Sequence, residues 1–144
     1  MDIKSFGTTD NNKIRNAEDQ LGIAFPADYK EFLLCTNGGT NIDYAMSFTV
    51  NELDDQIVVD SLFGIELDEN IDVVSNSQMF AFDMLPDSFL VGDSIQHGFI
   101  VLICAGADKG VYYWDHSYTY EISNDEGNMY WIAESFADFL ALLK

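Results

Sequence analysis

The sequence predicts an α+β domain, in which two N-terminal helices and one C-terminal helix pack on a mixed or antiparallel sheet of about five to six strands. Three observations support this fold class: apolar residues recur at helical spacing near both ends, they alternate or run together between those ends, and strands and helices do not alternate repeatedly. The chain has 144 residues, of which 48% are apolar and 14% aromatic. Domains commonly contain about 100 to 150 residues, so we expect one domain over residues 1–144 with a packed core.

Two short helices are expected to open the fold. Apolar residues follow helical spacing from about residue 10 to 21, and Gly22 supplies the stop. Pro26 suits the start of a second helix, which Asn37–Gly39 ends. The residues expected on the inward faces are Ile14, Ala17, Leu21, Tyr29, Phe32 and Leu33.

The period then changes to that of a sheet. Alternation at Ile42, Tyr44, Met46 and Phe48 predicts a half-exposed strand that starts at Thr40. A second strand is predicted over residues 56–63, an acidic loop over 66–72 and a short helix over 71–81.

The second half of the chain carries the clearest strand signals. Residues 89–93 predict a strand, and the continuous apolar run 99–104 predicts a central strand covered on both faces. The turn 106–110 joins that run to 111–114, so these two should form an antiparallel hairpin. A further exposed strand is predicted from Tyr118, Tyr120 and Ile122, and a core-facing terminal helix from Ile132, Phe136, Phe139, Leu140 and Leu143.

The net charge indicates the kind of partner. Six Lys and Arg residues stand against 25 Asp and Glu residues, a formal charge of −19, and no Lys or Arg lies between Glu31 and Asp108. Such a surface repels nucleic acid and anionic membranes, whereas it steers a basic protein toward it. The alternative interpretation is that the charge only keeps the protein in solution.

Cysteine and targeting signals favour a cytoplasmic protein. Cys35 falls in a predicted helix and Cys104 in an apolar strand, so we expect two buried thiols rather than a disulfide. The residues Met1–Ser5 lack the apolar centre of a signal peptide, and the longest apolar run, 99–105, is too short to span a membrane.

Catalytic and metal-binding patterns are incomplete. His97 and His116 are the two histidines, and neither accompanies a nucleophile motif. Residues 68–72 resemble the start of a calcium loop, but Val73 and Met79 occupy the positions that require Gly and Glu. Zinc and nucleotide motifs are absent. We therefore predict no metal, no cofactor and no enzymatic activity, although 25 carboxylates leave a hydrolase with an unrecognised acid pair as an alternative.

A series of motifs resembles a known superfamily. The motifs are Leu21–Leu33, Asn37–Gly39, Leu62–Gly64, Phe89–Asp93, Gly110–His116 and Ala133–Leu140. In this order they resemble the SUKH superfamily (Smi/Knr-type), which groups fungal cell-wall regulators with bacterial immunity proteins. Phe25 stands where the family more often has Leu, and residues 52–84 match no family pattern. The resemblance implies an α+β fold, no catalysis and, for bacterial members, occlusion of a cognate toxin that is often a nuclease.

The partner is therefore expected to be a basic toxin, with a regulatory or scaffolding interaction domain as the alternative. Motif residues are predicted to have structural roles because they end or start helices or look like core, and these are Gly22, Pro26, Tyr29, Gly38, Gly39, Trp114 and Phe136. Partner contact is predicted in the unmatched acidic segment, at Asp54, Asp55, Glu66, Asp68, Glu69 and Asp72.

Overall fold

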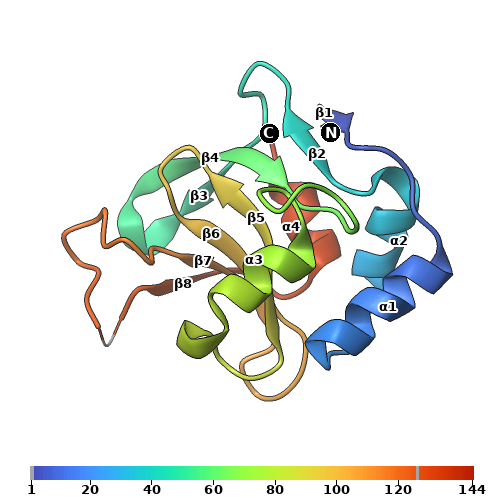
Figure 1. Ribbon diagram of the computed structural model, residues 1–144. Coiled ribbons are helices and arrows are strands. Elements are labelled where there is room, and N and C mark those ends of the chain that lie inside the picture. The colour runs from blue at the N-terminus through green and yellow to red at the C-terminus, as the bar shows by residue number, and fades with distance from the viewer. Residues whose placement is uncertain (1, 126) are drawn as a thin grey trace.

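The computed structural model describes residues 2–125 and 127–144, and within them four α-helices pack on an eight-stranded antiparallel sheet (Figure 1). The helices are α1 (Asn11–Leu21), α2 (Ala27–Thr36), α3 (Val73–Met79) and α4 (Phe136–Leu142), and two short 3-10 helices are η1 (Asn51–Leu53) and η2 (Ala81–Asp83). The strands are β1 (Ile3–Ser5), β2 (Gly39–Asn41), β3 (Ser47–Val50), β4 (Asp55–Leu62), β5 (Ser88–Ser94), β6 (Phe99–Ile103), β7 (Gly110–Trp114) and β8 (Met129–Ala133).

The sheet is largely a meander. Its order is β1-β2-β4-β5-β6-β7-β8, with β3 paired to β4 beside this path, and every strand pair is antiparallel. The fold class is therefore the predicted one, with antiparallel rather than mixed strand pairing. A register shift between Leu90 and Gly92 interrupts the β5–β6 ladder, and such bulges increase the local twist of a sheet.

Helix ends follow the residues that the sequence offers. The Asp10 carboxylate accepts the Lys13 N–H at 2.9 Å and so caps α1. Gly22 ends that helix with a left-handed φ of 66°. Gly38 serves close packing instead, because a Cβ there would lie 2.5 Å from the Leu62 carbonyl oxygen.

The core is centred on aromatic side chains from α2, β5 and α4. The ring of Tyr29 lies 4.9 Å from that of Phe136 and 5.2 Å from that of Phe89, between ring centroids. All three are buried, and burial of a side chain of this size contributes roughly 1.5–3 kcal/mol. Strand β5 is covered on both sides, because α3 packs on it and Phe89 faces α2; Figure 1 shows α3 in front of the strands and α4 behind them.

The start of the terminal helix was predicted too early. Ile132 lies in β8, and α4 begins only at Phe136, after the Ser135 hydroxyl accepts the Asp138 N–H at 3.1 Å. Ile132 is buried as a strand residue. It lies four positions before the buried Phe136, and this spacing happens to match a helical period. The predicted strand over Tyr118–Ile122 is also wrong, since that segment forms turns, and β8 occupies the place beside β7.

The predicted strand from Thr40 is two strands, β2 and β3. The backbone turns between them at Asp43 and Tyr44, whose φ values are 53° and 57°. Together with the short β1, this turn brings the strand number above the expected five to six. Helix α3 lies within the short helix predicted over 71–81, so it adds to the two N-terminal helices and one C-terminal helix of the predicted fold class.

The expectation of two buried thiols fails at Cys35. This side chain is exposed because α2 buries Tyr29, Phe32 and Leu33, and Cys35 lies outside that face. Cys104 is partly buried, and both cysteines are free. None of the helices in the described residues has both the length and the apolar character needed to cross a membrane.

Candidate partner-binding surface

The six acidic residues predicted for partner contact fall into two groups. Asp54 and Asp55 lie at the start of β4, whereas Glu66, Asp68 and Glu69 lie in the loop that follows its end. Figure 1 shows the β3–β4 hairpin and this loop at opposite ends of β4. At about 3.3 Å per residue, the strand separates them by roughly 23 Å, so the two groups lie at separate places on the surface.

Two members of the set are used inside the protein. Asp72 is buried, and its carboxylate accepts the Ser75 N–H at 2.8 Å and the Leu67 N–H at 3.2 Å, which caps α3 and shapes the preceding loop. Asp55 accepts the Tyr120 hydroxyl at 2.7 Å. The exposed carboxylates of the set that have no such internal role are therefore those of Asp54, Glu66, Asp68 and Glu69.

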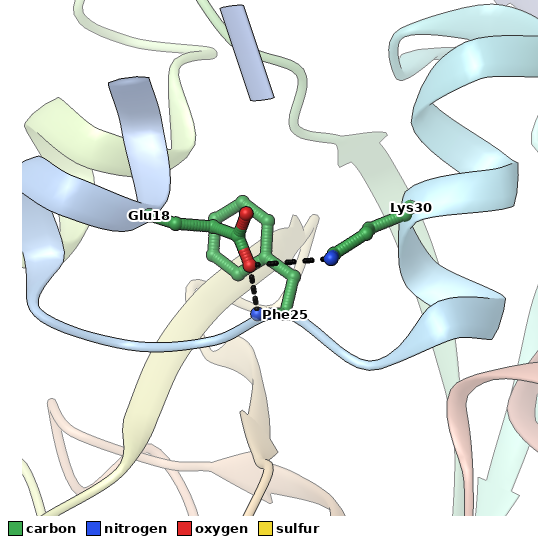
Figure 2. Close-up of polar contacts among 3 residues, drawn as sticks. All are labelled: Glu18, Phe25 and Lys30. Carbon is green, nitrogen blue, oxygen red and sulfur yellow. Dashed lines mark hydrogen bonds and ion pairs between the residues drawn. The ribbon is translucent and has the colours of Figure 1, made fainter. Parts of the chain in front are cut away.

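Nearly all the negative charge is uncompensated. Within residues 2–125 and 127–144 one ion pair forms, between Lys30 Nζ and Glu18 Oε2 at 3.5 Å. The same Glu18 oxygen accepts the Phe25 N–H at 2.7 Å, and Figure 2 shows that both contacts converge on the linker between α1 and α2. This pair fixes the linker, whereas the other carboxylates of these residues form no ion pair. Several of them accept internal hydrogen bonds, and the exposed ones can interact with water or with a partner.

Both histidines face one surface groove. The groove has a volume of about 500 Å³ and is lined by Asp60, Asp93, Ser94, Ile95, His97, Phe99, His116 and Ser117. The His116 ring packs on Phe99 with a centroid distance of 4.7 Å. No hydrogen bond in the described part of the chain joins either imidazole to a hydroxyl or a carboxylate, and no group of three or more His, Cys, Asp or Glu side chains there is arranged to hold a metal ion.

Burial shifts the pKa of two groups in this groove. Burial raises the pKa of Asp93 to about 6, and the nearby Asp60 raises it further, while hydrogen bonds from the Ser61 N–H and hydroxyl oppose the rise. Burial lowers the pKa of His116, against the attraction of Asp115. The groove therefore brings carboxylates and imidazoles together with the hydroxyls of Ser94 and Ser117.

Asp115 does not orient His116. Its buried carboxylate accepts the Thr119 N–H and the Tyr120 N–H, each at 2.9 Å, and the Ser123 hydroxyl at 2.6 Å. It therefore organises the turns between β7 and β8.

The structure places each residue that was predicted to be structural. Tyr29, Trp114 and Phe136 are buried, Pro26 directly precedes α2, and Gly39 packs against Ile3 of β1. Gly22 ends α1, whereas α2 ends at Asn37 and Gly38 packs against the backbone of β4.

An exposed apolar segment escaped the sequence reasoning. Met79, Phe82 and Leu85 all project into solvent between α3 and β5, and Phe82 is fully exposed. We call residues 79–85 the ridge. In the sequence this segment is a cluster of large apolar residues inside an otherwise acidic stretch. Such a cluster favours a buried helix end, so the sequence alone does not indicate that these side chains are exposed.

Comparison with known proteins identifies the family. The model of the SMI1 / KNR4 family (SUKH-1) matches residues 8–142, nearly the whole chain. Searches of curated proteins and of solved structures find no significant match.

Proposed function

Because the chain belongs to the SMI1 / KNR4 (SUKH-1) family, we propose that it is an immunity-type binding protein that neutralises a basic toxin by covering the toxin's functional surface. The protein acts in the cytoplasm, without metal, cofactor or catalysis of its own. The resemblance to bacterial immunity proteins supports this role, and a nuclease is the toxin class that best matches an acidic inhibitor.

The observation that carries the proposal is the uncompensated charge. The chain has 25 acidic and six basic residues, and one ion pair forms among the described residues. Unpaired exposed carboxylates weaken the compact state through their mutual repulsion. A basic partner relieves this repulsion. Binding such a partner therefore explains an excess of negative charge larger than solubility alone requires.

The mechanism separates capture from retention. Exposed carboxylates raise the local concentration of a cationic protein and increase its association rate by 10- to 1,000-fold at low ionic strength. A nuclease site is basic because it binds phosphates, so an acidic protein seated there excludes nucleic acid. Slow release then depends on the desolvated contacts at the centre of the interface.

The deciding experiment tests the product of the neighbouring gene as the candidate toxin. Its affinity for the protein is measured by calorimetry from low to high ionic strength, together with inhibition of the toxin's activity. We expect tight binding that weakens as salt rises, and inhibition at equal stoichiometry. Absence of binding, or binding to cellular proteins unrelated to a toxin, contradicts the proposal.

A matched pair of variants tests the acidic loop before α3. D68N/E69Q and D19N/E31Q remove the same charge from exposed positions, but only the first lies in that loop. The loop variant should slow association at low salt about 10-fold, and the helix variant should slow it less. Equal effects would show that the acidic surface as a whole, rather than this loop, raises the association rate.

A further inference from the structure

The ridge is held in a defined conformation. Phe80 points inward, and its ring packs 4.9 Å from that of Phe99 and 5.8 Å from that of Trp114. The Asp83 N–H donates to the Phe80 carbonyl oxygen at 3.0 Å and closes η2. Phe82 is therefore exposed on a turn whose conformation is fixed by the hydrogen bond of η2 and by the packed ring of Phe80, two residues earlier.

A hollow lies beside the ridge. It has a volume of about 360 Å³, and its lining includes Asp83 and Leu85 on one side and Trp114, Asp125 and Met129 on the other. None of the described residues that line it is basic. It combines two carboxylates with an indole and a thioether, and one of these carboxylates, Asp125, also accepts the Tyr118 hydroxyl at 2.7 Å through Oδ1. This setting suits a long cationic side chain, because its stem contacts apolar groups while its charge faces the carboxylates.

We propose that the ridge and this hollow are the contact for the partner: Phe82 and Leu85 enter an apolar depression on a basic protein, and one arginine or lysine of that protein enters the hollow between Asp83 and Asp125. This inference rests on the proposed function, and it names the surface through which that function operates. Exposed aromatic anchors beside charged groups are typical of interface centres, where a few residues supply most of the affinity.

The charge of this surface indicates which kind of partner binds there. A second copy of the chain carries the same charge of −19 and is repelled, as are nucleic acid and anionic membranes. A cationic protein fits, because the ridge carries Asp83 and is followed by Asp87, and the nearest Lys or Arg after it in sequence is Lys109. The occupant is therefore a basic protein with an apolar depression next to an arginine or lysine.

The first test measures the neighbouring toxin domain against single variants by calorimetry. F82A should weaken binding about 30-fold or more, and D83N about 10-fold. The control is Y44A, which removes another exposed aromatic from the β2–β3 connection, at the opposite end of the molecule from the end of α3 in Figure 1. It should change the affinity less than about twofold, and all three variants should keep the wild-type melting temperature. Equal affinities for F82A and wild type overturn the inference while the proposed function stands.

The second test does not need the toxin. N-acetyl-arginine amide is titrated into the protein at constant ionic strength and followed by ¹H–¹⁵N spectra. Shifts should concentrate at Leu85, Met129 and the Trp114 indole N–H, and D83N should reduce them. Shifts spread evenly over the acidic surface, or centred on the groove of Asp60 and Asp93, overturn the inference. If the toxin domain fails to bind at all, the proposed function fails, and this titration still decides whether the hollow takes a basic side chain.

Discussion

Replacing Asp93 by asparagine should stabilise the protein at neutral pH. The Asp93 carboxyl is largely buried in β5, and its pKa is raised from 3.8 to about 6. The native state therefore keeps a proton that the unfolded chain releases between these values, so stability falls as the pH rises from about 4 to about 6. One pKa unit corresponds to 1.36 kcal/mol. The difference between the folded and unfolded pKa of Asp93 therefore lowers the free energy of unfolding by about 3 kcal/mol, and this loss is complete at pH 7. Asparagine keeps an oxygen that accepts the Ser61 hydrogen bonds and carries no charge.

The assay is urea unfolding at a series of pH values from 4 to 8. We expect the free energy of unfolding of D93N to exceed that of wild type by about 1–3 kcal/mol at pH 7. Between pH 4 and 6 the stability of D93N should fall less than that of wild type, by the amount that the titration of one proton contributes. The control is E121Q, which removes a carboxylate that is exposed and should leave the slope in place. A variant that is less stable than wild type at pH 7, with an unchanged slope, would refute the reasoning.

Five further substitutions test other contacts. D115A removes the acceptor of three hydrogen bonds in the turns after β7 and should cost about 3 kcal/mol in urea unfolding; D115N should cost less, and equal losses would show that a neutral amide oxygen does not replace the carboxylate. E18A should cost about 1–2 kcal/mol, because the buried Phe25 N–H loses its acceptor, whereas K30M should cost at most about 0.5 kcal/mol, because it removes only a partly exposed ion pair; a larger loss for K30M contradicts this order. Y29F should leave stability unchanged or raise it by about 1 kcal/mol, since the buried Tyr29 hydroxyl has no hydrogen-bond partner in the described residues; thermal unfolding checks it, and a clear loss would reveal a partner for the hydroxyl.

The elements that the sequence predicted correctly are those whose local pattern agrees with their burial. The run at 99–104 is a strand covered on both faces, and the helix over 10–21 has both its cap and its terminal glycine. Prediction failed where tertiary packing decides. Ile132 is apolar in either state, and only the pairing of β8 with β7 makes it part of a strand. Strands of three residues, such as β1, are too short to display a period of two.

The candidate surface could be predicted only as a charge. The composition shows that acidic residues dominate, but it does not distinguish Asp72, which caps a helix, from Asp68, which faces water. Phe80 and Phe82 present the same difficulty, since one is anchored and the other exposed. Which side of a turn faces inward depends on the residues that approach it from β6 and β7, far along the chain.

Glu18 and Lys30 form the one ion pair among the described residues, and this scarcity affects how the protein responds to salt. Added salt screens the repulsion among the unpaired carboxylates, so it should strengthen the fold, whereas it should weaken the capture of a cationic protein. The two responses have opposite signs because they arise from the same charges. In the proposed complex, a bound cationic protein would therefore act as the fold's macromolecular counter-ion, and the complex should resist unfolding by more than its direct contacts account for.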